Sequence, residues 1–514
     1  MARNQSKPHA IVIPLPYQGI INPFINLALK IAAKGFTVTF VHLEFIHHRL
    51  SKAHHDSTID EVDFFSQARK SGLNIRCATI SDGFPMEFDR DLNFPEYWNF
   101  LVREFRERVD EFVGTMIRSD PNSVHFLVAE PLCAWPATVA EKYNIVNVSF
   151  STEAASAFSL AYHWDVLREK GHLPCKGAWI LRTSWRAPEG SVHPYTCDLR
   201  VCVNWTIQIE LDHNTVDLEI DYIPGVESIS TRDLMTYLDP ESIFSEALFP
   251  AFMNSKRADF IIHNTFEELE SKALSALNEH QKNYAIGPVN FFENPATNTV
   301  IRSFWHESDC AVWLGSKPPG SVLYVSFGSL VQTSKQFIRE VAYGLLLSGV
   351  NFIWVVRANI VGSSDSDVLP EGYEDEIRDR GIVIMWCDQI SVLSNPAVGG
   401  FLTHCGWNST VESIWCGVPM ICYPVAYDQP TNRKLVVDDW KIGTNLCEGT
   451  IDKEEISEKI KSFMNGTSSM GLLREEAEKV KEKIWNALEI DGSSQKNFDR
   501  FIEDLKEKLM HMSQ

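Results

Sequence analysis

The residues whose types and spacing point most directly to chemistry lie between positions 386 and 429. The run GGFLTH predicts a buried strand that ends at His404, and a tight CGWNS turn leads into a helix that begins near Asn408. Backbone N–H groups at a helix N-terminus, side-chain donors and one imidazole can bind a diphosphate without a cluster of cations. We therefore predict a diphosphate site formed by His404, Asn408, Ser409 and Thr410.

The same stretch carries side chains suited to a nucleoside. Glu412 lies one turn into the predicted helix and can accept hydrogen bonds from two ribose hydroxyls. Trp386 offers a flat face for a base, and Gln389 offers an amide that can both donate and accept. Together with the diphosphate site, these residues predict a bound nucleoside diphosphate.

This stretch resembles the signature box of plant secondary-product UDP-sugar glycosyltransferases, which are inverting enzymes of the GT-B fold. The segments VSFGSL (325–330), YAIGPV (284–289) and the opening LPYQG…NPF are also similar to that family. The resemblance covers essentially the whole chain apart from residues 175–220. It implies an α/β fold with two Rossmann-like domains facing a central cleft. It also implies a UDP-sugar co-substrate, no cofactor, and no metal, since the protein itself neutralises the diphosphate.

The resemblance also implies a role for individual residues. Trp386 resembles the uracil-stacking residue, Gln389 a nucleoside contact and Glu412 the ribose-binding residue. The expected diphosphate contacts are His404, Asn408, Ser409 and Ser329. The expected contacts to the donor sugar are Trp407, Asp428, Gln429 and Thr152, with Gly19 also assigned to the donor site. A Gln at position 429 is associated with UDP-glucose more than with UDP-galactose.

The sequence departs from the family at its catalytic pair. Members usually read QGHINP, where the His deprotonates the acceptor, but this chain has Ile20 at that position. The partner Asp is replaced by Glu130, and a positioned general base typically contributes roughly 10²–10⁴-fold. Three interpretations remain open: Glu130 is itself the base, the acceptor is acidic enough to need little help, or the protein binds a UDP-sugar with little or no turnover.

The predicted acceptor is a small, largely apolar metabolite in the N-terminal domain, near Phe84, Glu130 and the helix after Thr152. The attacking group would be a hydroxyl or a carboxyl. One alternative is a catalytically impaired or repurposed UDP-sugar-binding homologue. A nicotinamide-dependent dehydrogenase is a weaker alternative, because no GxGxxG follows the first predicted strand.

The elements that position these residues alternate between strands and helices in both halves of the chain. This order predicts parallel sheets, and such sheets bind ligands beyond the carboxyl ends of their strands. The predicted organisation is an acceptor-binding domain at 1–289, a linker at 290–304, a donor-binding domain at 305–490 and a helix at 491–514 that packs back on the N-terminal domain. An insert at about 175–220 contains a period-two alternation over 201–212 that predicts a strand.

Composition limits the remaining function classes. The chain has 514 residues and a formal net charge of −21, which disfavours nucleic acid and anionic membrane surfaces as partners. No signal peptide or membrane span is predicted, and the cysteines lack paired CxxC spacing, so we expect a cytoplasmic monomer with reduced thiols. The histidines at 42, 47, 48, 54 and 55 lack a compact ligand geometry and predict a solvated surface.

Overall fold

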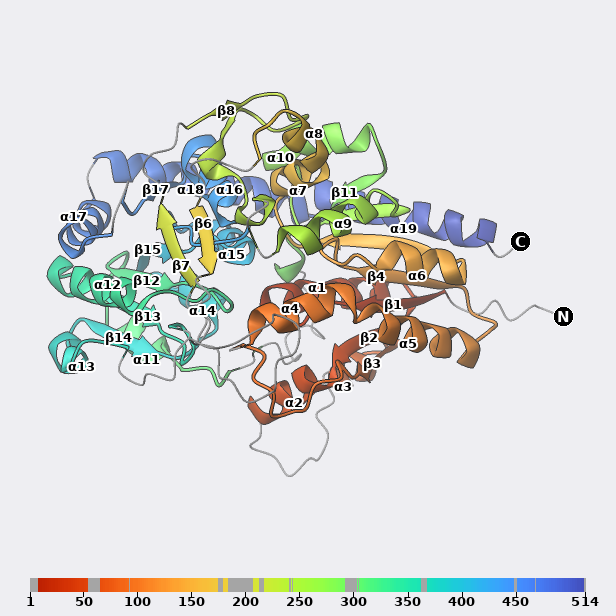
Figure 1. Cartoon of the computed structure of the whole chain (residues 1–514). Helices are drawn as coiled ribbons and strands as arrows, with labels where there is room; N and C mark the ends of the chain where they lie inside the picture. Colours follow the sequence, from red (N-terminus) through yellow and green to blue (C-terminus); the bar gives the residue numbers. More distant parts are fainter. Residues whose placement is uncertain are drawn as a thin grey trace, which may run out of the picture.

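The computed structural model describes residues 8–53, 65–91, 93–173, 179–183, 207–211, 217–239, 242, 244–291, 303, 305–361, 368–447, 451–466 and 468–512. These residues form two α/β domains, each built on a parallel sheet with helices packed against it (Figure 1). In Figure 1 the strands β1, β2, β3 and β4 of the first domain, in red and orange, lie to the right of the strands of the second domain, in green and blue. The predicted pair of Rossmann-like domains is confirmed.

The N-terminal sheet has seven strands in the order β11-β10-β5-β4-β1-β2-β3. The strands are β1 (His9–Ile13), β2 (Thr37–Leu43), β3 (Ile75–Ile80), β4 (His125–Ala129), β5 (Val146–Ser151), β10 (Phe260–His263) and β11 (Asn283–Ala285). Every residue of β1 is buried, as is typical of a parallel strand covered on both faces. The strand order reverses between β1 and β4, and a ligand crevice is expected at the carboxyl ends of such a pair.

Helices cover the N-terminal sheet and connect its strands. They are α1 (Gln18–Ala33), α2 (Glu44–Ala53), α3 (Ser66–Lys70), α4 (Phe94–Arg103), α5 (Arg106–Ser119), α6 (Pro136–Tyr143), α7 (Ala155–Tyr162), α8 (Trp164–Glu169), α9 (Ser245–Ser255) and α10 (Glu267–Asn278). The one-turn helices η1 (Thr231–Asp233) and η2 (Thr236–Leu238) lie in the segment that faces the second domain.

The C-terminal sheet has six strands in the order β14-β13-β12-β15-β16-β17. They are β12 (Val322–Ser326), β13 (Asn351–Val355), β14 (Gly381–Ile384), β15 (Val398–Thr403), β16 (Met420–Cys422) and β17 (Gly443–Asn445). The helices of this domain are α11 (Ala311–Gly315), α12 (Lys335–Ser348), α13 (Tyr373–Ile377), α14 (Gln389–Leu393), α15 (Trp407–Cys416), α16 (Gln429–Lys434), α17 (Lys453–Met464) and α18 (Ser468–Leu488). Here the order reverses between β12 and β15, so a second crevice opens above these strands.

The last helix, α19 (Ser493–Met512), lies against the N-terminal sheet beside β11 (Figure 1). Ser494 Oγ donates to the carbonyl of Gly287 at 2.5 Å, and Asn497 Nδ2 donates to that of Ala285 at 3.1 Å. The chain therefore returns to its first domain after completing the second. The predicted domain bounds stay predictions, and most of the predicted linker, residues 292–302 and 304, lies outside the described residues.

Part of the insert forms a two-stranded antiparallel sheet, β6 (Trp179–Thr183) with β7 (Ile207–Leu211). The predicted strand at 201–212 includes β7, and the remainder of that run lies outside the described residues. A second short pair, β8 (Glu219–Ile220) with β9 (Ile229–Ser230), leads into η1.

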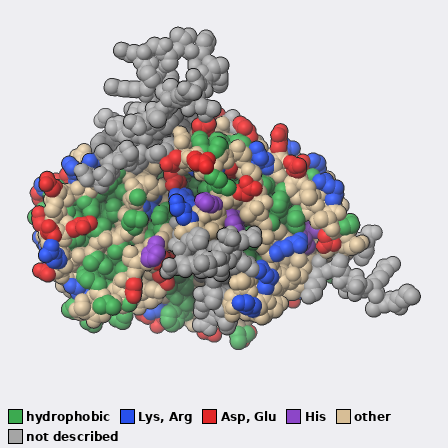
Figure 2. Space-filling model, turned by 90° about the horizontal axis from the view of Figure 1, so that it is seen from below, with side chains coloured by type: hydrophobic (Ala, Val, Ile, Leu, Met, Phe, Trp, Pro, Cys, Tyr) green, Lys and Arg blue, Asp and Glu red, His purple; other side chains and the backbone are tan. Residues whose placement is uncertain are grey.

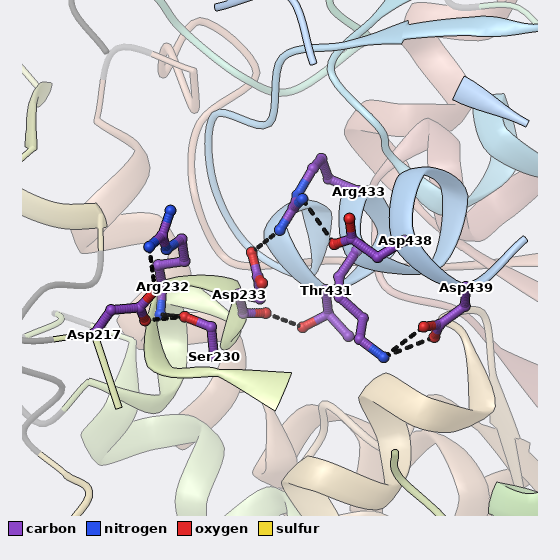
Figure 3. A network of polar contacts seen from close by, with 9 residues as sticks. Asp217, Ser230, Arg232, Asp233, Thr431, Arg433, Asp438 and Asp439 are labelled. Atoms are coloured by element: carbon purple, nitrogen blue, oxygen red, sulfur yellow. Dashed lines mark hydrogen bonds and ion pairs between the residues drawn. The ribbon is translucent and has the colours of Figure 1, made fainter. Parts of the chain in front are cut away.

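Polar contacts join η1 and η2 of the first domain to α16 of the second, and we call this region the seam (Figure 3). Arg433 of α16 forms an ion pair with Asp233 of η1, and Thr431 Oγ1 donates to the Asp233 carbonyl at 2.7 Å. Thr236 and Tyr427 exchange two hydrogen bonds, from Thr236 N to the Tyr427 carbonyl at 2.9 Å and from Tyr427 N to Thr236 Oγ1 at 2.8 Å. The seam therefore fixes one domain against the other beside the residues that follow β16.

Candidate active site

A cavity of about 1260 Å³ lies between the two domains, at the carboxyl ends of both sheets. Its walls include residues that follow β1, β4 and β5 on one side and β12, β14 and β15 on the other. All but one of the residues predicted for the donor site line this cavity: Gly19, Thr152, Ser329, Trp386, Gln389, His404, Trp407, Asn408, Ser409, Glu412, Asp428 and Gln429. Thr410, predicted to contact the diphosphate, is absent from the described lining and is fully buried. The structure thus brings these residues together, while their roles toward UDP stay predictions.

The predicted diphosphate end is built from the turn between β15 and α15. Gly406 is the N-cap residue of α15 and supplies no side-chain cap, and the first turn of the helix carries no acidic residue. The first N–H groups of α15 therefore remain available to an anion. Asn408 Nδ2 donates to the Gly19 carbonyl at 2.5 Å, so this helix end also contacts the N-terminal domain.

Two glycines enclose the imidazole of His404. A Cβ added to Gly328 would lie 2.3 Å from His404 Nε2, and a Cβ added to Gly406 would lie 2.6 Å from the same atom. Gly328 also has a φ of +75°, which disfavours any residue with a side chain. Burial and then the positive charge of Arg357 lower the pKa of His404 to about 3, so the ring is neutral in the free protein. Its Nδ1 has no hydrogen-bond partner among the described residues.

The predicted nucleoside end is held by a chain of side-chain hydrogen bonds. Gln389 Nε2 donates to Ser409 Oγ at 3.0 Å and to Glu412 Oε2 at 2.7 Å, while Gln389 Oε1 accepts from Tyr324 Oη at 3.2 Å. The ring of Trp386 packs against that of Trp305, with centroids 4.5 Å apart. These contacts fix the groups predicted to hold the base and the ribose before any ligand arrives.

The predicted sugar contacts lie where α15 and α16 face the N-terminal domain. Trp407 Nε1 donates to the Asn264 carbonyl at 2.8 Å, so the indole N–H already has a partner, and the role of Trp407 toward a sugar hydroxyl stays a prediction. Gln429 Oε1 accepts from the backbone N–H groups of residues 425 and 426 at 2.8 and 2.9 Å. Asp428 Oδ2 accepts from Asn432 Nδ2 at 2.7 Å, and burial raises the pKa of Asp428 to about 6.

Sequence reasoning missed a second carboxyl at this end of the cavity, that of Glu153. It directly follows Thr152 at the end of β5, and it lines the cavity together with Tyr237 and Asp428. Tyr237 Oη donates to Glu153 Oε2 at 3.0 Å. Burial, followed by the negative charge of Asp428, raises the pKa of Glu153 to about 8. Its position next to Thr152 was the signal available in the sequence.

The two replaced catalytic positions have different surroundings. Ile20 lies in the first turn of α1 and lines the cavity. Glu130 follows β4, is 0 % exposed and is absent from the described residues that line the cavity. Its Oε2 accepts from Thr152 Oγ1 at 3.2 Å, whereas its Oε1 has no partner among the described residues. Burial and then the charge of Glu153 raise the pKa of Glu130 well above its usual range, and its role as base stays a prediction.

The rest of the cavity wall on the N-terminal side is largely aromatic. Phe94 and Trp98 of α4 line it together with Phe244 and Leu248. Phe84, which we expected in the acceptor pocket, is absent from the lining and instead stacks on the ring of Phe88 with centroids 4.5 Å apart. The ion pair between Asp82 and Arg90 fixes this loop behind the wall.

No group of three or more His, Cys, Asp or Glu among the described residues has an arrangement that could hold a metal ion. Of the histidine run, His42 is buried in the core, which differs from the predicted solvated surface, and residues 54 and 55 lie outside the described residues. Within the same described part of the chain, no helix is long and apolar enough to cross a membrane. Acidic and basic side chains are interspersed on the face shown in Figure 2.

Comparison with known proteins identifies the family. The family model described as "UDP-glucoronosyl and UDP-glucosyl transferase" matches residues 306–472. UDP-glycosyltransferase 86A1 of Arabidopsis thaliana is 45 % identical to this chain, over 98 % of this chain and 95 % of that protein. The 7-deoxyloganetin glucosyltransferase of Catharanthus roseus is 32 % identical, over 98 % of this chain and 98 % of that protein. The crystal structure of a UDP-glucose: anthocyanidin 3-O-glucosyltransferase in complex with UDP shares the fold, with a TM-score of 0.77 at 23 % identity over 98 % of this chain and 100 % of that one. The chain therefore belongs to the UDP-glycosyltransferase family, whose members transfer a sugar from a UDP-sugar donor.

Proposed function

We propose that this enzyme transfers glucose from UDP-glucose to a hydroxyl or carboxyl of a small, largely apolar metabolite, with inversion at the anomeric carbon. The observation that carries the proposal is the cavity between the domains, which joins the predicted donor residues to an aromatic wall. A donor sugar at Asp428 and Gln429 lies between the diphosphate end and that wall. An acceptor on the wall can then attack the anomeric carbon from the side opposite to the leaving UDP, and one such displacement inverts the configuration.

UDP leaves toward His404 and the N-terminus of α15. The charge that develops on the diphosphate is stabilised by the N–H groups of the first turn and by the donors of Asn408 and Ser409. Because these groups are fixed before the reaction, they cost little reorganisation when the charge appears. The chain itself thus supplies the stabilisation of the leaving group, and we propose that transfer needs no bound metal.

A neutral hexose suits the carboxyls at the sugar end of the cavity. Glu153 and Asp428 both line it, and the pKa of Asp428, about 6, leaves that group largely ionised at neutral pH. The carboxylate of a glucuronic acid donor would meet this charge in a buried site, where like charges repel strongly. The relatives named above include enzymes described as glucosyltransferases, which agrees with glucose as the donor sugar.

The wall favours an apolar acceptor that still carries oxygen atoms. Phe94, Trp98, Phe244 and Leu248 offer aromatic and aliphatic surface. Tyr17 Oη and Trp98 Nε1 are buried beside the cavity without a hydrogen-bond partner in the described part of the chain. Buried polar groups normally have a partner, so we propose that oxygens of the acceptor contact these two donors.

The proposal extends to where and how the enzyme works. The described cysteines are free thiols, which persist in a reducing compartment, and we propose the cytoplasm as its location. We also propose that the chain acts as a monomer. Light scattering of the purified protein tests the monomer, and localisation of a tagged chain tests the compartment.

A UDP-release assay tests the function. The protein is incubated with UDP-glucose, UDP-galactose or UDP-glucuronic acid and a panel of apolar phenols, carboxylic acids and alcohols, and products are identified by mass spectrometry. We expect a hexosylated product with UDP-glucose and at least one apolar acceptor. Glu412→Ala serves as the control with an impaired donor site. Tight binding of UDP with no transfer across the panel would contradict the proposal and favour a UDP-sugar-binding protein that has lost catalysis.

A further inference from the structure

Transfer to a hydroxyl releases a proton, and the family's position for the proton acceptor holds Ile20. The side chain of Ile20 lines the cavity but cannot accept a proton. His404 also lines the cavity, but its pKa of about 3 makes it a poor base. The remaining candidates are carboxyl groups, and those that line the cavity among the described residues are Glu153, Glu307, Asp388, Glu412 and Asp428. Of these, Glu153 is the one that the N-terminal domain contributes, on the side where the acceptor binds.

We propose that Glu153 is the catalytic base of this enzyme, an inference that rests on the proposed function. Its carboxyl lines the cavity at the end of β5, next to Thr152 and in the same wall as Ile20. The Tyr237 hydroxyl donates to Oε2 at 3.0 Å and fixes the orientation of the group. The neighbouring Asp428 is the predicted contact to the sugar, so Glu153 lies beside the donor sugar as well as on the acceptor side.

Three titratable groups face Glu153 from the elements packed around it. Asp428 lies at the N-cap of α16, Glu130 lies at the end of β4, and Tyr237 lies in η2. All are acidic or neutral, and burial together with Asp428 raises the pKa of Glu153 to about 8. An efficient general base has a pKa near the working pH, because it must be deprotonated and still hold a proton well. An ordinary surface carboxylate, with a pKa near 4.3, would be a far weaker base.

The proposed step balances without any further reactant. As the acceptor oxygen forms its bond to the anomeric carbon, its proton moves to the Glu153 carboxylate. The bond between the anomeric carbon and the diphosphate oxygen breaks, and its electron pair leaves with UDP. The protonated Glu153 then returns its proton to solvent after the products depart.

Glu130 is the competing carboxyl. It is fully buried, lies outside the described lining of the cavity and contacts Thr152 through one oxygen. A base must come within hydrogen-bond reach of the proton that it removes. Thr152 and Glu153 line the cavity, whereas Glu130 lies behind Thr152, and the geometry therefore favours Glu153.

Five variants test this assignment: Glu153→Gln, Glu130→Gln, Ile20→His, the double variant Ile20→His/Glu153→Gln, and Glu169→Gln as a matched control on the exposed face of α8. For an alcohol acceptor, we expect Glu153→Gln to lower kcat/KM by about 10²–10⁴-fold, the contribution of a positioned base. The Kd for UDP should not change, since UDP lacks the transferred hexose beside which Glu153 lies. Glu130→Gln should lose much less activity, and Glu169→Gln should match the parent enzyme.

The double variant separates a base from a sugar-binding residue. If Glu153 acts as the base, the imidazole of Ile20→His replaces it, and the double variant recovers most of the activity that Glu153→Gln loses. The pH profile must agree: parental kcat/KM reaches half of its plateau near pH 8 and levels off about one pH unit above, whereas the double variant reaches half of its plateau nearer pH 6.5, the ordinary pKa of His.

Several outcomes would overturn the assignment. Full activity of Glu153→Gln would do so. A double variant that stays as slow as Glu153→Gln would also do so, because the Glu153 carboxyl would then bind the donor sugar and not act as the base. A larger loss in Glu130→Gln than in Glu153→Gln would assign the base to Glu130. In each of these cases the parental enzyme still transfers sugar and the proposed function stands. If the parent enzyme and Ile20→His both bind UDP but neither transfers sugar, the proposed function and this assignment are overturned together.

Discussion

One substitution in the seam should lower the rate of sugar transfer while leaving the affinity for UDP unchanged. Asp233 and Arg433 are 9 % and 12 % exposed, and they pair across the domain boundary (Figure 3). Asp233→Asn keeps the size and shape of the side chain but removes its charge. Arg433 retains Asp438 at 2.9 Å, and that partner is 48 % exposed.

The expected cost follows from this geometry. Removing one partner of a buried ion pair typically costs about 3–5 kcal/mol, because the other charge is left uncompensated. Since Asp438 still neutralises Arg433, we expect Asp233→Asn to destabilise the contact between the domains by about 2 kcal/mol, which is below the lower end of that range. A loss of about 2 kcal/mol lowers the equilibrium constant for the domain arrangement seen in the structure by about 30-fold, and we expect kcat/KM to fall by up to that factor.

Two measurements check this prediction. UDP titration by calorimetry should give the parental Kd, because Trp386, Gln389 and Glu412 all belong to the C-terminal domain. Initial-rate UDP release should show the loss in kcat/KM. Asp375→Asn is the matched control, because Asp375 pairs with Arg378 on the surface, and exposed pairs contribute about 0–1 kcal/mol. Parental kcat/KM in Asp233→Asn, or a UDP affinity that falls in parallel with it, would refute the positioning role of the seam.

Three other perturbations have defined outcomes. Glu412→Ala should raise the Kd for UDP by at least about 100-fold in calorimetry, because two hydrogen bonds to a charged group are lost at about 1.5–3 kcal/mol each; a change below tenfold would contradict the ribose assignment. Arg90→Met should lower the free energy of unfolding, measured in urea, by about 3–5 kcal/mol, because the buried Asp82, which is 3 % exposed, loses its partner. The double variant Arg90→Met/Asp82→Asn should recover part of that loss. Asp428→Asn should raise kcat/KM for UDP-glucuronic acid relative to UDP-glucose in the UDP-release assay, and an unchanged ratio would remove Asp428 as the group that rejects acidic sugars.

The sheets and the donor residues were predictable from the sequence for local reasons. Strands such as β1 and β12 are continuous apolar runs, which identify buried parallel strands. Most of the donor residues fall within one stretch around α15, where a strand end, a glycine turn and a helix N-terminus follow one another directly. By contrast, β3 has no such apolar run, because its middle residues are polar or partly exposed, as expected for an edge strand.

The acceptor side was less predictable, because long-range packing decides it. Tyr237 and Glu153 are 84 residues apart in sequence, and no local pattern indicates that they meet. Among the aromatic residues after β3, sequence spacing could not tell which would face the cavity. Packing of α4 places Phe94 and Trp98 there, while the ion pair of the preceding loop holds Phe84 behind them.

The replacements at Ile20 and Glu130 are electrostatically consistent with each other. An Asp that orients a catalytic His must stay ionised to stabilise the imidazolium, but with Ile20 in place of His no such cation forms. In the described part of the chain, no Lys or Arg pairs with Glu130, and burial raises the pKa of Glu130 well above its usual range. A protonated Glu130 is neutral, so it does not oppose ionisation of Glu153. An ionised Glu130 would raise the pKa of Glu153 further and leave a smaller fraction of that base deprotonated. The loss of the imidazole and a buried, neutral Glu130 are therefore both compatible with moving the base to Glu153.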